Sequence, residues 1–205
     1  MIGTDEVTTM ARPREFDRTQ VLDQAIEVFW QRGYEGTSIQ DLVDRMGIHR
    51  GSLYCAFGDK HGLFLAALDR YEEVFHSKIL DRLAAGGLRG GARHAIRQVF
   101  DDVVRSCAGQ AGRKGCLMTN SAVELAARDG DTAARVSANL SRLEEALCAA
   151  VRTAQADGEL SRKYDARALA RFLLSSLQGL RVMGMACHDR TVLRDVARVT
   201  LSILD

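Results

Sequence analysis

The sequence predicts an all-α protein, and three observations lead to this fold class. The chain has a single proline in 205 residues, so few of its segments are barred from a helix. Ala, Leu, Arg and Glu, which favour helices, are abundant, and only 6% of the residues are aromatic. No sustained alternation of β-branched and polar residues occurs, as a half-buried strand would require. We therefore expect about nine helices.

The first helix is predicted behind a polar segment. Residues 1–14 should form a flexible basic arm that includes Arg14. The helix spans 17–32, because Asp17 is a good N-cap and Gly33 a good stop. Its apolar residues recur at helical spacing and predict a core-facing stripe made of Val21, Leu22, Ala25, Ile26, Phe29 and Trp30.

Two short helices follow, and their spacing indicates a function. The first spans 38–46, with Thr37 or Ser38 as its cap, and the second spans 50–56. Gly47 provides the break between them, because glycine reaches left-handed backbone angles at little cost. A helix, a tight turn and a second helix that crosses the first form the pattern of a DNA-reading helix-turn-helix.

The residues expected to contact DNA lie around the second helix of this pair. Its N-terminal end enters the major groove in such a unit, where Arg pairs with guanine and Ser reaches several base edges. The N-terminus of the preceding helix offers free N–H groups to a phosphate. A lysine in the first turn of the next helix is misplaced for the helix dipole unless a phosphate lies nearby. The candidates are Arg14, Thr37, Ser38, His49, Arg50, Gly51, Ser52, Tyr54 and Lys60.

The charge balance does not by itself indicate a nucleic-acid-binding protein. The net charge is +1, and residues 1–60 contain 7 Lys or Arg against 10 Asp or Glu, which gives −3. Phosphate contacts supply most non-specific DNA affinity, so any DNA binding must depend on a few placed cations. Arg45, Arg50 and Lys60 surround the second helix of the pair and are such cations.

The rest of the chain is predicted to form further helices. The one over 59–83 has a long apolar face and should act as a lever between two domains. Its histidines, His61 and His76, should lie on a solvated surface. A Gly-rich basic segment over 109–115 is interpreted as a connector, since no Gly-Lys-Ser/Thr ends it. The other predicted helices span 92–107, 116–128, 131–157, 165–186 and 191–204.

The last two helices contain more apolar residues than one buried face can hide. Small residues, such as Ser176 and Gly179, would allow two helices to approach closely. Excess apolar surface of this kind suggests a two-fold interface between identical subunits. The residues expected in it are Phe172, Leu173, Ser176, Leu177, Leu180, Val192, Val196, Val199 and Ile203.

The five cysteines point to a reducing compartment. Their number is odd and they lack the close spacing of zinc sites or secreted scaffolds, so we expect reduced thiols, a cytoplasmic location and no metal. No apolar run is long enough for a membrane span, and no membrane partner is expected. Cys116 is notable because it begins a predicted helix beside Arg113 and Lys114, which would lower its thiol pKa.

Residues 12 to about 75 resemble the TetR family of bacterial repressors in the order and spacing of their motifs. The chain departs from the family pattern at His49 and at Cys55-Ala56. The matching residues are Arg12-Pro13-Arg14, Ala25, Phe29, the run 33–38, Ile39, Asp41-Leu42, Met46-Gly47-Ile48, Gly51-Ser52-Leu53-Tyr54, Phe57, Lys60 and Leu63-Phe64.

The resemblance implies an all-α homodimer with three parts. They are the arm over 1–14, a three-helix DNA-binding domain over 15–60, and a ligand-binding and dimerisation domain over 61–205. It also implies a repressor that leaves a pseudo-palindromic double-stranded DNA operator when an unknown small-molecule effector binds. Residues that could line the effector pocket are Phe75, Phe100, Val103, Cys107, Cys116, Met118, Asn120, Glu124 and Leu143.

Three alternatives remain at this point. Cys116 could sense electrophiles or oxidants, or it could be a buried apolar thiol. In a different class, the chain could be a helical thiol enzyme, although no Cys/His signature supports a catalytic residue. It could also be a helical interaction protein that does not read DNA. No cofactor is predicted under the leading interpretation.

Overall fold

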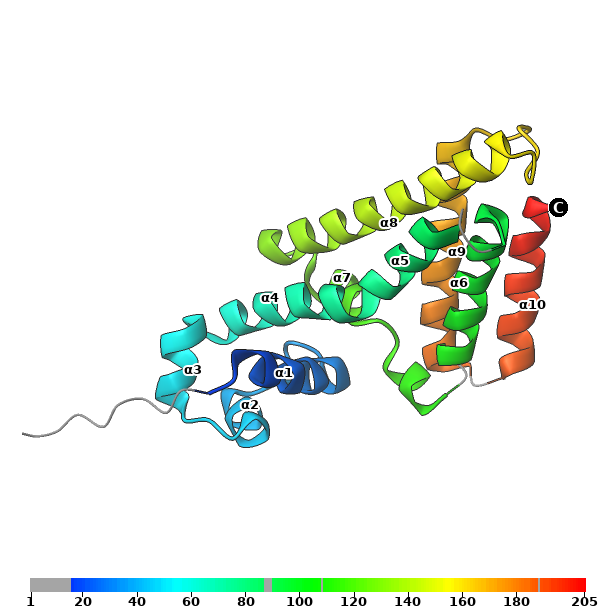
Figure 1. The fold of residues 1–205 in the computed structure, drawn as a ribbon. Coiled ribbons are helices and arrows are strands. Elements are labelled where there is room, and N and C mark those ends of the chain that lie inside the picture. Colours follow the sequence, from blue (N-terminus) through cyan, green and yellow to red (C-terminus); the bar gives the residue numbers. More distant parts are fainter. Residues whose placement is uncertain (1–15, 87–89, 108, 188) are drawn as a thin grey trace, which may run out of the picture.

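A computed structural model describes residues 16–86, 90–107, 109–187 and 189–205. Every regular element within these ranges is a helix, in agreement with the predicted fold class. The first three helices form one end of an elongated molecule, and the C-terminal helices form a bundle at the other end (Figure 1). Within the described ranges, no helix has the length and apolar character needed to cross a membrane.

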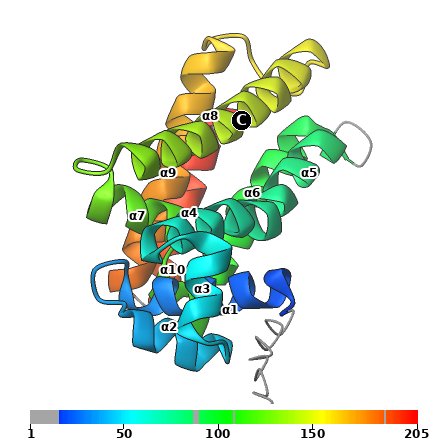
Figure 2. The ribbon, with the colours of Figure 1, turned by 90° about the vertical axis from the view of Figure 1, so that its left-hand side faces the viewer.

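The N-terminal helices begin and end where their capping residues predict. They are α1 (Arg18–Arg32), α2 (Ile39–Met46) and α3 (Arg50–Phe57). Ser38 caps α2 in a reciprocal capping box with Asp41. Gly47 ends α2 in the left-handed conformation, with φ of 64°, which turns the chain into α3. In Figure 2, α2 and α3 lie together at the end of the molecule that faces the viewer.

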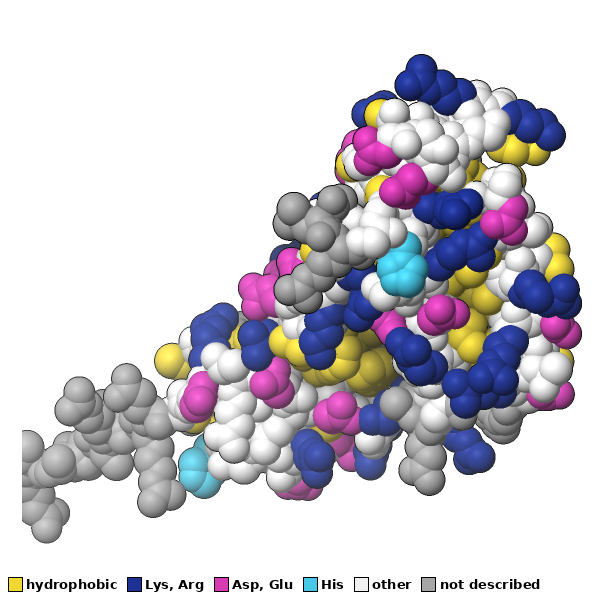
Figure 3. All heavy atoms as spheres, turned by 45° about the vertical axis from the view of Figure 1, so that its right-hand side comes forward, with side chains coloured by type: hydrophobic (Ala, Val, Ile, Leu, Met, Phe, Trp, Pro, Cys, Tyr) yellow, Lys and Arg dark blue, Asp and Glu magenta, His cyan; other side chains and the backbone are white. Residues whose placement is uncertain are grey.

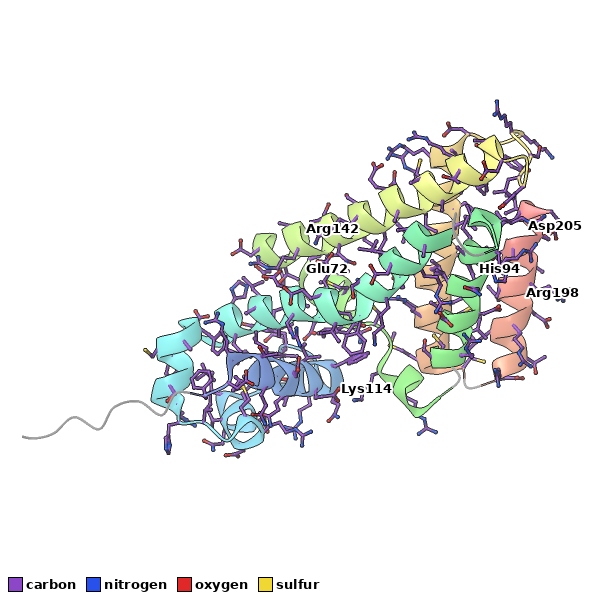
Figure 4. The ribbon with its side chains drawn as sticks, viewed as in Figure 1. Glu72, His94, Lys114, Arg142, Arg198 and Asp205 are labelled. Atoms are coloured by element: carbon purple, nitrogen blue, oxygen red, sulfur yellow. The ribbon has the colours of Figure 1, made fainter. Side chains whose placement is uncertain are left out.

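The long helix predicted over 59–83 is interrupted. It consists of α4 (Lys60–Tyr71), a π-helical turn over Glu72–His76 and α5 (Ser77–Ala85). A π turn contains one extra residue per hydrogen-bonded ring, so it shifts the side chains that follow around the helix axis. Arg142 of α8 (Gly130–Ala156) donates to both carboxylate oxygens of Glu72, and Figure 4 shows these two side chains facing each other.

The C-terminal helices match their predicted positions closely. The expectation of a continuous helix up to Leu204 is corrected at its end by a 3₁₀ turn over Ser202–Leu204, and a second 3₁₀ turn covers Gln110–Lys114. Helix α7 is shorter than predicted and stops at Leu125. These helices are α6 (Ala92–Cys107), α7 (Leu117–Leu125), α8 (Gly130–Ala156), α9 (Ala166–Ala186) and α10 (Arg190–Leu201).

Two hydrophobic cores hold the molecule together, and α7 belongs to the N-terminal one. One core joins α6, α8, α9 and α10. The other joins α1 to α4 and also contains Cys116, Leu117, Met118 and Leu125 from the start and the end of α7. Burial of apolar surface is the main stabilising term in such contacts, so α7 is fixed to the N-terminal end of the molecule. The predicted division at residues 60 and 61 remains a prediction.

The residues expected at a subunit interface divide into two groups. Leu173, Leu177 and Leu180 are buried in the chain's own core and are not available to a second subunit. Helical periodicity does not distinguish these three leucines from residues on the solvent-facing side of the helix, because α9 has apolar residues on both faces. The surface group contains Phe172, Ser176, Val192, Val196, Val199 and Ile203, of which Phe172 is 46% and Val199 65% exposed.

Candidate functional sites

The N-terminal end of α3 presents an open polar surface. Arg50 is exposed, and its guanidinium donates to Oε1 of Gln40 at 2.8 Å. A Cβ placed on Gly51 would meet no atom within 4 Å, so the chain's own packing does not require glycine there. Tyr54 is 46% exposed and Ser52 is half-buried. His49 lies at the N-cap of α3 without a capping side-chain hydrogen bond. These groups are placed to meet an incoming surface.

The loop between α1 and α2 holds two other candidate residues in internal contacts. Thr37 is buried, and its hydroxyl donates to the carbonyl of Gly33 at 2.6 Å. Lys60 donates to the carbonyls of Tyr34 at 3.0 Å and Thr37 at 2.9 Å, and its ammonium lies 4.1 Å from the Tyr34 ring centroid. The internal carbonyls therefore account for a lysine at a helix N-terminus without a phosphate. Arg14 lies outside the described residues.

A cavity of about 370 Å³ lies between the two ends of the molecule. Its walls come from the end of α1, the π turn, α5, α6 and the 3₁₀ turn before α7. Near the middle of the face in Figure 3, apolar side chains are bordered by Lys and Arg side chains. The lining residues are Trp30, Tyr71, Phe75, His76, Lys78, Ile79, Arg82, Val99, Asp102, Val103, Ser106, Cys107, Gly112, Gly115, Cys116 and Arg181.

Cys116 and Arg181 form the polar centre of this cavity. The guanidinium of Arg181 donates to Sγ of Cys116 at 2.7 Å. Nε2 of His76 lies 3.2 Å from Nη1 of Arg181 and 3.8 Å from Sγ. The side-chain nitrogen of Asn139 lies 2.6 Å from the other ring nitrogen of His76. All of these contacts are formed in the interior, since Cys116, His76 and Asn139 are each at most 2% exposed.

The geometry favours the ionised form of Cys116. Burial of the thiol opposes ionisation, but the charge of Arg181 and the contacts of His76 outweigh burial and hold the pKa of Cys116 well below its ordinary value. Burial raises the pKa of Tyr71 well above its ordinary value, so this neighbour stays neutral. A guanidinium is always charged and is costly to bury without a counter-charge. Cys116 is the group that can supply it.

Sequence reasoning missed most of this centre. His76 is buried rather than solvated, because the π turn rotates it inward. Trp30 lines the cavity and forms edge-to-face contacts with Tyr71 and Phe75, whose ring centroids lie 5.1 and 5.2 Å away. Arg181 is 65 positions away from Cys116 in the chain, and no local pattern pairs them.

Four of the nine residues expected in an effector pocket line the cavity: Phe75, Val103, Cys107 and Cys116. The structure places the other five elsewhere. Phe100 and Leu143 are in the C-terminal core, and Met118 is in the N-terminal core. Asn120 donates to the carbonyl of Lys114 at 2.8 Å, outside the lining. Glu124 binds the loop between α1 and α2. Helical periodicity predicts on which face of its helix a residue lies, but it does not predict which other element packs against that face.

One further cluster could hold a cation. Ligand atoms of His61, Asp129 and Asp131 lie within 4.8 Å of one another. Asp129 already caps α8, accepts a hydrogen bond from the Thr132 hydroxyl and pairs with His61 at 2.9 Å. These contacts, with Thr132 first, lower the pKa of Asp129 to about 2. These hydrogen bonds already engage both carboxylate oxygens of Asp129 and join α4 to the start of α8.

Two family profiles match the chain. A profile described as "Bacterial regulatory proteins, tetR family" matches residues 21–67, which include α2 and α3. A profile described as "Tetracyclin repressor-like, C-terminal domain" matches residues 92–200, from α6 to α10. The two matches therefore cover both ends of the molecule, with the π turn and α5 between them.

Individual relatives are similar over nearly their whole length. YezE of Bacillus subtilis, an uncharacterized HTH-type transcriptional regulator, is 38% identical over 96% of this chain and 100% of its own. The HTH-type transcriptional repressor ComR of Escherichia coli is 32% identical over 94% of this chain and 90% of its own. A cysteine mutant of the TetR family regulator CifR, complexed with 26 base pairs of operator DNA, has a TM-score of 0.80 at 33% identity, covering 93% of this chain and 98% of its own.

Proposed function

Because the chain belongs to the TetR family and is a DNA-binding transcriptional repressor, we propose that a small molecule in the cavity beside Cys116 releases it from its operator. It is a regulator rather than an enzyme, as its family is. Its partners are operator DNA and a second copy of itself. We infer a cytoplasmic location, because that is where a bacterial operator is found.

We assign operator reading to the exposed N-terminal end of α3. Arg50, Gly51 and Ser52 are its candidates for base contacts, supported by the open surface around them. Ser38 at the start of α2 and Tyr54 are candidates for phosphate contacts. His49 and Arg14 complete the proposed set. Thr37 and Lys60 contribute through the loop that they hold, with the third ammonium proton of Lys60 left for a phosphate.

The single observation that supports release from the cavity is its position. Trp30 in its wall belongs to α1 of the DNA-reading domain, whereas Val99 and Val103 belong to the C-terminal bundle. A ligand that fits one relative position of these walls better than another shifts the population between them. In the dimer, such a shift changes the separation of the two α3 helices, which must match successive major grooves about 34–36 Å apart.

A cavity-filling variant tests this proposal while the effector is still unidentified. Operator DNA is first identified by selection of bound genomic fragments, and small molecules are then screened for release of wild-type protein. Val103→Trp fills the cavity from the α6 wall, so it should bind the operator normally and resist release. Equal release of Val103→Trp and wild type by the same molecule would contradict a site in this cavity.

A second candidate is favoured by the Cys116–Arg181 contact: the effector is an electrophile that reacts with Cys116. A thiolate adds to the β-carbon of an unsaturated carbonyl compound and forms a C–S bond. The displaced π electrons move to the carbonyl oxygen, and the resulting enolate takes a proton from water. The thioether product is neutral, so Arg181 would lose the negative charge beside it. The guanidinium would then be uncompensated in the centre of the cavity, which is costly.

A further inference from the structure

Helix α7 has the cavity at one end and the DNA-reading domain at the other. Its N-cap is Cys116, and its last turn contains Glu124. We propose that Glu124 is a positioning residue for operator recognition, which fixes the start of α2 and transmits changes at the cavity to it. The transmission half of this proposal rests on the proposed release from the cavity, whereas the positioning half concerns DNA binding alone.

Glu124 binds two consecutive backbone amides of the loop between α1 and α2. Its carboxylate accepts from the N–H of Tyr34 at 3.0 Å and from the N–H of Glu35 at 2.9 Å. Two adjacent N–H groups that point the same way form a concave anion site, and a carboxylate bound there makes charge-assisted hydrogen bonds. The loop is thus shaped around an acidic side chain that comes from 89 or 90 positions away.

The residue before these amides must be glycine for this contact. Gly33 has φ of +72°, and a Cβ placed on it would lie 2.8 Å from Oε2 of Glu124. Both the backbone conformation and the close approach therefore require the absence of a side chain. The loop conformation and the position of Glu124 are mutually dependent.

The same loop sets the start of α2. Lys60 holds the carbonyls of Tyr34 and Thr37 from the side of α4, and Ser38 directly after them caps α2. The loop is therefore held by α4 through Lys60 and by α7 through Glu124. A displacement of α7 relative to α4 would move the amides of the loop away from its carbonyls, and the N-terminus of α2 with them.

The other end of α7 is also attached to the DNA-reading domain. Nε1 of Trp30 donates to the carbonyl of Lys114 at 3.0 Å, and the ammonium of Lys114 pairs with Glu27 of α1. Figure 4 shows Lys114 next to the end of α1. Gly115 and Cys116, which follow Lys114, line the cavity. A ligand that displaces this segment therefore acts directly on the N-terminal end of α7.

The positioning role is tested with Glu124→Gln against Glu35→Gln in the unmodified, full-length protein. Both changes remove one carboxylate from the same interface, but among the described residues the Glu35 side chain forms only an exposed ion pair with Arg128 at 3.6 Å. Glu124→Gln should weaken operator binding about tenfold, the size of a lost charge-assisted hydrogen bond. Affinity for non-operator DNA should change as little as in Glu35→Gln, because phosphate contacts are retained.

A merely structural role would instead lower the melting temperature and weaken binding to both DNAs alike, and this outcome would overturn the proposal. Equal operator affinity of the two variants would overturn it as well. The transmission half is tested with iodoacetamide as the thiol probe. After alkylation of Cys116, wild type should leave the operator, whereas Glu124→Gln should bind with the affinity that it had before alkylation; full release of Glu124→Gln would overturn this half.

The proposed release from the cavity can be wrong while the positioning role of Glu124 is right, and the experiments distinguish the two cases. If alkylated wild-type protein stays on the operator, the electrophile switch at Cys116 is wrong, and with it the transmission of an electrophile signal through Glu124. The comparison of unmodified Glu124→Gln with Glu35→Gln still decides the positioning role, because it requires no effector.

Discussion

At the scale of single residues, the contact between the partly buried Arg181 and the buried Cys116 is the least expected feature. Arg181 takes its charge compensation from the ionised Cys116, whose Sγ accepts a hydrogen bond from the guanidinium. An uncompensated buried guanidinium would cost several kcal/mol. The thiolate is therefore part of the fold as well as the proposed reaction centre, and its removal by alkylation affects both.

The ionised state of Cys116 gives a prediction for pH dependence. In the unfolded chain, the thiol has its ordinary pKa of about 8.5, so its alkylation rate rises about tenfold per pH unit up to that value. In the folded protein the pKa is lowered, so the rate at Cys116 should change little between neutral and alkaline pH. Iodoacetamide labelling followed by peptide mass spectrometry measures both rates. A tenfold rise per unit in the folded protein would contradict the ion pair.

The sequence pointed to Cys116 but not to the cause of its reactivity. The sequence predicts that the nearby Lys114 lowers the pKa of Cys116. In the structure, however, the ammonium of Lys114 pairs with Glu27. Arg181 provides the cation instead, from the C-terminal part of α9. Local charge can be read from a sequence, but pairing across 65 positions depends on how helices pack. For the same reason, the sequence predicts Glu124 in the pocket, whereas its carboxylate binds the loop between α1 and α2.

At the scale of elements, the caps explain why the helix boundaries could be predicted. Asp17 and Ser38 each accept a hydrogen bond from a backbone N–H in the first turn, as predicted, and Asp165 does the same for α9. The π turn over Glu72–His76 was not predictable, because its apolar pattern continues that of α4. It matters for function, since His76 reaches the cavity only through this turn.

The element that reads DNA gives the next prediction. Arg50→Ala removes a guanidinium that can bind guanine bidentately from the exposed start of α3, so operator binding should weaken by about 1–3 kcal/mol. Binding to non-operator DNA should change much less. Arg152→Ala, which removes an exposed arginine from α8, is the matched control. Fluorescence anisotropy on both DNAs measures the effect, and an equal response of the two variants would argue against this docking of α3.

At the scale of the whole molecule, the apolar residues left exposed on α9 and α10 define the proposed dimer face. Phe172 and Val182 of α9 are 46% and 45% exposed, and Val199 of α10 is 65% exposed. Contiguous exposed apolar groups are typical of subunit interfaces. The low positive charge of the molecule makes the dimer necessary, because one subunit offers few phosphate contacts.

A charge at this face should separate the subunits. Val199→Asp places a carboxylate in an apolar contact, where an unpaired charge is costly, so the variant should be monomeric and bind operator far more weakly. Val123→Asp is the control, because Val123 is an exposed apolar residue, at 83%, that belongs to α7 rather than to α9 or α10. Sedimentation at matched concentrations reports the oligomeric state. A dimeric Val199→Asp would place the interface elsewhere.

The central claim is that the chemical state of the cavity controls DNA binding at the other end of the molecule. The most direct test follows operator anisotropy and Cys116 modification in the same samples during iodoacetamide treatment of wild type, Cys116→Ser and Cys107→Ser. Cys107 lines the same cavity and is the matched control. Release should follow modification of Cys116 in wild type and in Cys107→Ser, whereas the operator affinity of Cys116→Ser, whatever its initial value, should not change during the treatment. Operator binding that persists with Cys116 fully modified would contradict control by this thiol.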